Sequence, residues 1–171
     1  MQSQWVDNEI MRLILSALMP ENRLACEISM ATGLRIGDVL KLKPSDVLPT
    51  KERFTIKEEK TGKRRTVYLP KKLRERAYAI SGRFWVFEHR LDRTKHRTRQ
   101  AVFKDLRRAC LLLRIKENIT PHSARKSFAV EYFNRSGGDM KKLKNLFNHS
   151  NEAVTYIYAM ANCLTYRKKK R

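Results

Sequence analysis

The sequence has few acidic residues for its length. Its 171 residues include 17 Asp and Glu against 38 Lys and Arg, which gives a formal net charge of +21 and a pI near 10.4. A bias of this size indicates a polyanionic partner. Charge alone does not separate DNA from RNA or an anionic membrane surface, and a generally solvated basic surface, as in ribosomal proteins, gives the same composition.

Cysteine is scarce as well. The three cysteines, Cys26, Cys110 and Cys163, are odd in number and far apart in the sequence. This pattern excludes a disulfide framework and favours buried thiols in a reducing compartment. The sequence has no Cys-x-x-Cys motif and no Cys/His cluster, so we expect no structural zinc and no other cofactor.

Long apolar runs, linkers and repeats are also missing. No apolar stretch approaches the roughly 20 residues of a membrane span, and the first residues lack a signal-peptide pattern. No Ser/Gly-rich linker divides the chain, and 42% of its residues are hydrophobic, which is enough for a core. We therefore expect a single domain over 1–171 that has no membrane partner and is cytoplasmic, or nuclear if the source is eukaryotic.

Hydrophobic periodicity and capping residues predict a mainly α fold with a small antiparallel β-sheet (α+β). Alternating residues around a Thr-Gly-Lys turn predict a hairpin over 54–69, and 84–87 is a candidate third strand. The expected helices cover 7–19, 21–32, 36–41, 70–79, 98–113, 121–136, 140–147 and a last segment from 151.

One stretch, Thr120-Pro-His-Ser-Ala-Arg, has the features of an anion site. Thr120 is a good helix cap and Pro121 suits the first turn. His122 and Arg125 are three apart and share one helix face. Backbone N–H groups at a helix start attract phosphate, and an arginine can bind two of its oxygens.

A histidine and two tyrosines downstream could act on an anion bound at this helix start. His149 ends the stretch Leu146-Phe-Asn-His, and Tyr158 follows nine residues later. A tyrosine hydroxyl beside a bound phosphate is a nucleophile facing an electrophilic phosphorus. Tyr156 is an alternative; two residues apart on a helix, the two tyrosines face nearly opposite ways, so only one can enter the pocket.

Two upstream cations complete the set. Arg35, in Ala31-Thr-Gly-Leu-Arg, is predicted at a helix–helix turn, where an arginine taken alone is more often a surface residue. Lys60 lies in the hairpin turn and can swing toward a ligand, or it is one of several cations that hold only a DNA backbone. Lys63 is its rival, and the sequence pattern does not choose between them.

These four motifs, in this order and spacing, resemble the tyrosine recombinase (phage-type integrase) family, catalytic domain. The resemblance implies cleavage and rejoining of DNA through a 3′-phosphotyrosine, without metal or ATP. In it, two arginines stabilise the phosphate, the hairpin lysine is the general acid, and the two histidines serve the tyrosine proton and a phosphate oxygen. The catalytic residues it implies are Arg35, Lys60, His122, Arg125, His149 and Tyr158.

Three positions depart from the family pattern. Asn148 stands where glycine is usual, Asp38 where glutamate is commoner, and Lys126 where a histidine commonly follows the second arginine. Asn tolerates the left-handed conformation of such a turn, and none of the departures removes a catalytic group. The family's N-terminal core-binding domain is expected to be absent, and 159–171 is expected to be a basic tail.

The expected partner is double-stranded DNA, with the protein a monomer alone and a homotetramer on synapsed DNA. Two alternatives remain: a non-catalytic basic DNA-binding relative of recombinases, and a type IB topoisomerase-like enzyme. Besides the catalytic set, the residues expected to contact DNA are Lys57, Lys63, Arg64, Arg65, Arg97, Arg99 and Lys126.

Overall fold

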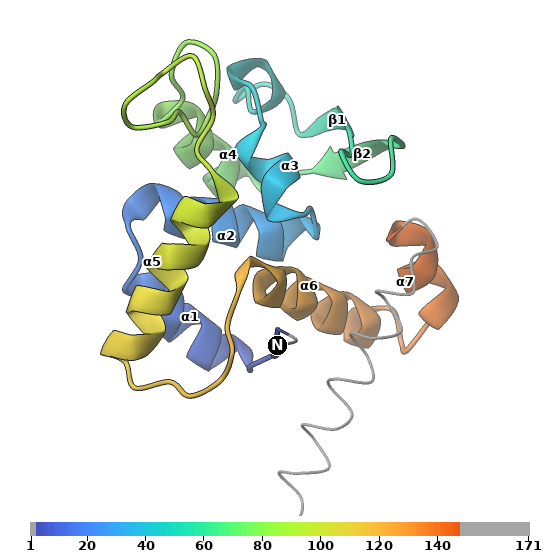
Figure 1. Cartoon of the computed structure of the whole chain (residues 1–171). Helices are drawn as coiled ribbons and strands as arrows, with labels where there is room; N and C mark the ends of the chain where they lie inside the picture. The colour runs from blue at the N-terminus through green and yellow to red at the C-terminus, as the bar shows by residue number, and fades with distance from the viewer. Residues whose placement is uncertain (1–2, 148–171) are drawn as a thin grey trace, which may run out of the picture.

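The structure is a computed structural model that describes residues 3–147. Over this range the fold is mainly helical with a two-stranded antiparallel sheet, which confirms the predicted fold class (Figure 1). No helix in the described range is long and apolar enough to cross a membrane. The elements are α1 (Asn8–Ser16), α2 (Pro20–Thr32), α3 (Ile36–Leu40), the 3-10 turn η1 (Pro44–Asp46), β1 (Arg53–Lys57), β2 (Arg64–Tyr68), α4 (Lys71–Ala79), α5 (Arg99–Leu112), α6 (Pro121–Arg135) and α7 (Met140–Leu146).

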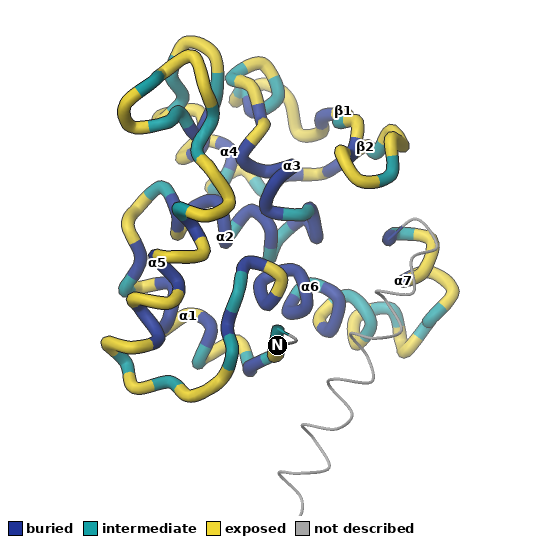
Figure 2. The backbone as a smooth tube through the Cα atoms, viewed as in Figure 1, coloured by how far each residue is buried: buried dark blue, intermediate teal, exposed yellow. Residues whose placement is uncertain are grey.

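Helix α2 lies at the centre of the molecule and packs against α1, α3, α4, α5 and α6 (Figure 1). Its predicted core residues Leu24, Ala25 and Ile28 are all buried. Burial concentrates along α2 and the first half of α6, whereas the connecting loops are largely exposed (Figure 2). The core therefore supports the two helices whose ends carry the predicted arginines.

The helix starts follow the capping residues. Asp7 accepts a hydrogen bond from the Ile10 N–H at 2.9 Å, and Asp139 accepts one from the Lys142 N–H at 2.9 Å. Each cap satisfies a backbone donor that has no partner within its own helix. These short side-chain contacts explain why sequence alone placed both starts.

The turn from α2 to α3 depends on Gly33. This glycine ends α2 at φ 69°, in the left-handed region, and donates its N–H to the Ser29 carbonyl at 2.8 Å. A Cβ at this position would lie 2.4 Å from Cδ1 of Phe128 on α6. The corner thus needs glycine for its backbone and for its close approach to α6.

The hairpin pairs β1 with β2 in the register Phe54↔Val67. Its turn is closed by two backbone hydrogen bonds of 2.9 Å, from the Glu58 N–H to the Lys63 carbonyl and from the Gly62 N–H to the Glu58 carbonyl. In Figure 1 the hairpin lies beside α3. It therefore holds the turn with Lys60 next to the corner that begins with Gly33.

The predicted third strand over 84–87 is wrong. In this part of the described chain, β-type pairing is limited to one isolated bridge between Glu88 and His96. Val86 and Phe87 are buried in the core, and the Val86 N–H donates to the Leu42 carbonyl at 2.9 Å. The run is apolar because an irregular segment fills the core, not because it pairs with a strand.

Two of the cysteines match the prediction of buried free thiols. Cys26 and Cys110 are both buried and unbonded to each other. Burial, with smaller contributions from nearby carboxylates, raises the pKa of Cys26 to about 12. Cys163 lies outside the described residues.

Candidate active site

Arg35 lies at the helix–helix turn that the sequence predicted. It is the N-terminal cap residue of α3, and its side chain is 11% exposed. Its guanidinium nitrogen Nη1 is 3.3 Å from Oε2 of Glu58 in the hairpin. This arginine is therefore held by the hairpin rather than spread on the surface.

Arg125 lies in the second turn of α6 and is 1% exposed. Its guanidinium carbon is 4.4 Å from the centroid of the Phe147 ring, which follows α7. A cation over an aromatic face is attracted by the ring quadrupole, and more strongly where water is excluded. Phe147 has no role in the sequence-based prediction of the site, although its position two residues before the predicted catalytic His149 could have indicated that it lies near the site.

The two arginines share one electrostatic neighbourhood, centred on Asp38 of α3. Burial raises the pKa of Asp38, the Glu59 N–H lowers it, the nearby Glu58 carboxylate raises it, and Arg35 and Arg125 both lower it. The net pKa is above the usual aspartate value. Both guanidiniums are thus close enough to act on the same carboxylate, despite their distance in sequence.

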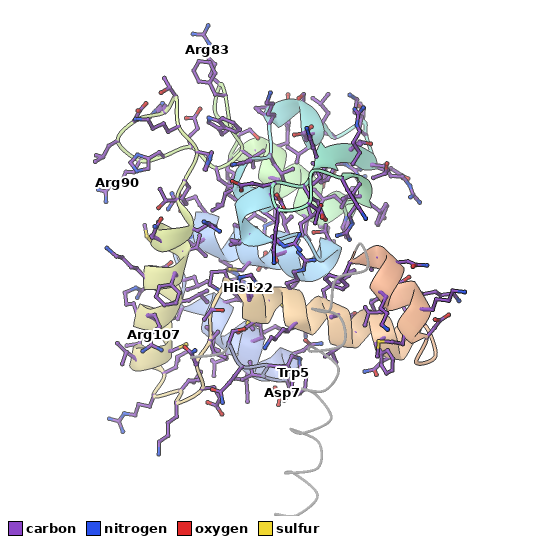
Figure 3. All side chains as sticks on the ribbon, turned by 45° about the vertical axis from the view of Figure 1, so that its right-hand side comes forward. Trp5, Asp7, Arg83, Arg90, Arg107 and His122 are labelled. Carbon is purple, nitrogen blue, oxygen red and sulfur yellow. The ribbon has the colours of Figure 1, made fainter. Side chains whose placement is uncertain are left out.

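His122 is exposed in the first turn of α6. Figure 3 shows it near the middle of the molecule, whereas Arg83 and Arg90 point away from the body. The helix start is built as predicted: Thr120 Oγ1 accepts the His122 N–H at 3.2 Å, and Ser123 Oγ accepts the Thr120 N–H at 3.1 Å. This fixed start directs the α6 dipole toward the site.

Lys60 and its rival Lys63 are both exposed in the hairpin turn. The turn is attached to α3 because the Glu59 N–H donates to Oδ1 of Asp38 at 3.0 Å. The Glu59 side chain forms an exposed ion pair with Lys41 at 3.0 Å, and such a pair contributes little in water. The structure thus places the hairpin turn beside α3, which follows Arg35. The preference for Lys60 over Lys63 still rests on the family resemblance.

Glu58 is a site residue that sequence reasoning missed. It is 1% exposed, and its carboxylate lies 3.3 Å from Arg35 and 3.5 Å from Arg65. The Thr61 hydroxyl donates to Oε2 of Glu58 at 3.0 Å. The inward alternation of every second residue that predicted β1 extends to Glu58 and not to Glu59, so this register was a usable signal.

Four of the predicted DNA-contact residues are exposed: Lys57, Lys63, Arg64 and Arg99. Two arginines have protein partners instead. Arg65 donates to the Thr32 carbonyl at 2.7 Å, and Arg97 donates to Oδ1 of Asn22 at 3.3 Å. These contacts indicate that both arginines help hold the fold together.

Lys126 differs from the expectation of a phosphate contact. It is 4% exposed, and its ammonium group donates to the backbone carbonyl of Ser3. The reason is that α6 is covered on all sides here: every residue from Ser123 to Ser127 is buried, so the Lys126 side chain has no route to the surface. It braces the N-terminal segment in this structure.

His149 and Tyr158 lie outside the described residues, as do Asn148, Tyr156 and the basic tail. The structure therefore places four of the six predicted catalytic residues. Of these, Arg35 contacts Glu58 and Arg125 contacts Phe147, while Lys60 in the hairpin turn and His122 at the start of α6 are exposed.

A helical domain with one small hairpin beside two fixed arginines has the fold of integrase catalytic domains. The catalytic domain of bacteriophage HP1 integrase superposes with a TM-score of 0.64 at 22% identity, covering 92% of this chain and 89% of that one. A lambda integrase tetramer bound to a Holliday junction gives 0.74 at 20% identity, covering 91% and 48%.

Residues 4–163 match the phage integrase family. The tyrosine recombinase XerA of Thermococcus onnurineus (strain NA1) is 29% identical over 169 residues, which cover 94% of this chain and 59% of that protein. The chain belongs to the phage integrase family. It spans about three fifths of the length of this curated relative.

Proposed function

We propose that this chain is the catalytic domain of a site-specific DNA recombinase that cuts and rejoins DNA strands through a 3′-phosphotyrosine. The observation that carries the proposal is the pair of arginines: Arg35, at the start of α3, lies 3.3 Å from Glu58, and Arg125, in the second turn of α6, lies 4.4 Å from the Phe147 ring centroid. The charges of both arginines lower the pKa of Asp38. Fixed guanidiniums keep their charge and match phosphate oxygens. Family membership supplies the reaction class that this anion site serves.

In the proposed reaction, the Tyr158 hydroxyl attacks the scissile phosphorus. The phosphorus–O5′ bond breaks, and the 5′ oxygen takes a proton from Lys60 as it leaves. Negative charge builds on the non-bridging oxygens, where Arg35 and Arg125 stabilise it. The phosphotyrosine conserves the energy of the phosphodiester, so a 5′ hydroxyl of another strand reverses the step without ATP.

Two histidines assist these steps. His122, exposed at the start of α6, takes the tyrosine proton, and His149 donates a hydrogen bond to a phosphate oxygen. An imidazole suits the first role because its ordinary pKa lies near neutral pH. Neither group requires a metal.

Double-stranded DNA is the proposed partner. The exposed Lys57, Lys63 and Arg64 of the hairpin and Arg99 at the start of α5 supply cations toward the backbone. Contacts of this kind position a protein on the duplex and carry little sequence information. A protein with this substrate works on the nucleoid in the cytoplasm.

The proposed assembly is a monomer alone and a homotetramer on synapsed DNA. The net charge of +21 disfavours association without DNA because like charges repel. The likeness to lambda integrase, whose tetramer is bound to a Holliday junction, supports four copies at the exchange step. The basic tail over 159–171 is the proposed assembly segment of a single catalytic domain.

A nicked suicide substrate tests the reaction. Cleavage close to the nick releases a short oligonucleotide, so the enzyme remains trapped on DNA through its tyrosine. We expect a covalent complex with the full chain, none with Tyr158→Phe, and one with the matched control Tyr156→Phe. Equal trapping by Tyr158→Phe would contradict the assignment, and no trapping by any variant would leave the non-catalytic DNA-binding relative.

A plasmid relaxation assay separates the remaining alternative. A type IB topoisomerase-like enzyme relaxes supercoils as a monomer at any protein concentration. A recombinase instead needs two sites brought together, so strand exchange should rise steeply with protein concentration. Efficient relaxation of a plasmid without exchange would favour the topoisomerase.

A further inference from the structure

Glu58 connects two parts of the site that sequence reasoning treated separately. Its carboxylate contacts Arg35 at the α2–α3 corner and Arg65 on β2, at 3.3 and 3.5 Å. Its backbone closes the hairpin turn, donating to Lys63 and accepting from Gly62, both at 2.9 Å. One residue therefore joins the first arginine to the turn that carries Lys60.

The electrostatics of this cluster suit a buried anchor. Taking a carboxylate out of water is costly unless it is paired, and here two guanidiniums surround it. Burial lowers the pKa of Arg65, while the Glu58 carboxylate raises it again. With the neighbouring Asp38 and Arg125 included, three guanidiniums face two carboxylates, so the neighbourhood stays net positive and attractive to phosphate. The Glu58 carboxylate offsets the repulsion between Arg35 and Arg65.

The Thr61 hydroxyl adds the link to Lys60. It donates to the same Oε2 that lies beside Arg35, at 3.0 Å, and it belongs to the residue next to Lys60. A shift of the Glu58 carboxylate would therefore move both the guanidinium and the turn. The exposed Glu59 pairs instead with Lys41 at the surface.

We propose that Glu58 is a positioning residue that sets where Lys60 stands relative to Arg35. This role rests on the proposed recombinase function, because it acts through the general acid and the arginine of that reaction. Misplacing a reacting group by about 1 Å costs on the order of 100-fold in rate. A charged residue that holds two such groups in register thus controls the chemical step without touching DNA.

The test compares Glu58→Gln with Glu59→Gln, a control that removes the same charge one residue away. Cleavage of the nicked substrate is measured in a single turnover at saturating DNA, with thermal melting followed in parallel. Each variant is also given a substrate whose leaving 5′ oxygen is replaced by sulfur. A thiolate leaves without a proton donor, so this substrate bypasses Lys60.

We expect Glu58→Gln to cleave the oxygen substrate about 10- to 100-fold more slowly than the unmodified chain, with DNA affinity unchanged or higher. The sulfur substrate should recover part of this loss, because Lys60 is bypassed while Arg35 stays misplaced. Glu59→Gln should stay within about 3-fold on both substrates. A Glu58→Gln variant as fast as Glu59→Gln, or a loss that sulfur does not reduce, would overturn the proposal.

Thr61→Val decides the matter if Glu58→Gln does not fold. It removes only the hydroxyl link at a half-exposed turn position. We expect Thr61→Val to reduce the cleavage rate less than Glu58→Gln does. The sulfur substrate should restore the full rate, because Arg35 keeps its position in this variant. An unchanged cleavage rate on the oxygen substrate would refute the link through the Thr61 hydroxyl. If the unmodified chain forms no covalent complex, the proposed function fails and the positioning role fails with it, whereas an active chain with unaffected variants removes the positioning role alone.

Discussion

Replacing Gly33 by alanine should destabilise the protein through two separable effects. The backbone there has φ 69°, and a residue with a Cβ pays about 1–2 kcal/mol in this conformation. The new Cβ would also lie 2.4 Å from Cδ1 and 2.5 Å from Cε1 of Phe128. Crowding of this kind costs about 1–3 kcal/mol, so we expect a total loss of about 2–5 kcal/mol.

The Phe128 ring has little room to move away. It stacks on Tyr132 at 5.8 Å between centroids and meets Phe147 edge to face at 6.1 Å. Phe147 in turn supports Arg125. If Phe128 moves to relieve the clash, it displaces Phe147 and with it Arg125. Gly33→Ala should therefore reduce DNA cleavage as well as stability.

Gly137→Ala is the matched control. Gly137 has the same φ of 69° just after α6, but a Cβ there would meet nothing within 4 Å. Both changes are Gly to Ala, so their effects on the unfolded chain cancel in the comparison. The difference between the two free energies of unfolding isolates the crowding against Phe128.

Urea denaturation followed by circular dichroism measures both variants. We expect Gly33→Ala to lose about 1–3 kcal/mol more than Gly137→Ala, at unchanged m-value. Phe128→Leu in the Gly33→Ala background should show a favourable coupling of at least about 0.5 kcal/mol. Equal losses for the two alanine variants would refute the close approach of the corner to α6.

Three further predictions test the site and the fold. Phe147→Leu should weaken the hold on Arg125, a contact worth about 0.5–2 kcal/mol, and slow single-turnover cleavage with DNA affinity nearly unchanged; unaltered cleavage would argue against the contact. Burial acts to raise the pKa of Asp105, but hydrogen bonds from Asn22, Arg108 and Met19 outweigh burial, and the net pKa is lowered. The ionised carboxylate therefore stabilises the fold at any pH above the usual aspartate pKa. This stabilisation is lost as the pH falls through the lowered pKa of Asp105. Asp105→Asn should therefore cost about 1–3 kcal/mol at neutral pH and flatten the acid side of a stability–pH curve; an unchanged curve would contradict this. Affinity for duplex DNA should fall steeply with salt, by roughly one unit of log–log slope per neutralised phosphate, and a shallow slope in a fluorescence-anisotropy titration would contradict a phosphate-dominated interface.

Local chemistry made much of the fold predictable. Asp7, Thr120 and Asp139 begin helices because a side-chain oxygen reaches a backbone N–H two or three residues on, which depends on neighbours in sequence alone. Gly33 ends α2 for an equally local reason. The placement of Arg35 at a turn followed from Gly33, because α3 has no side-chain cap of its own.

What the sequence could not show depends on distant partners. Val86 and Phe87 have the apolar character of a strand, but the Val86 N–H donates to the Leu42 carbonyl and the Phe87 carbonyl accepts from the Arg97 N–H, both in irregular segments. The alternation of β1 indicates that Glu58 faces inward, but its partner Arg35 lies 23 residues away in sequence, and only the fold brings the two together. The roles of His149, Tyr158 and the single-domain limits of the chain stay predictions.

The segment ahead of α1 is joined directly to the start of α6. Ser123 donates its hydroxyl to the Gln4 carbonyl at 2.7 Å, the Gln4 N–H donates to the Asn118 carbonyl at 2.9 Å, and Lys126 donates to Ser3. These bonds flank Arg125 on its own helix. We therefore expect a tag or fused protein placed ahead of Ser3 to disturb the helix start of the proposed anion site. The contacts of residues 3–4 with α6 thus connect the segment ahead of α1 to the helix that carries Arg125, on a side of the helix for which the proposed reaction has no use.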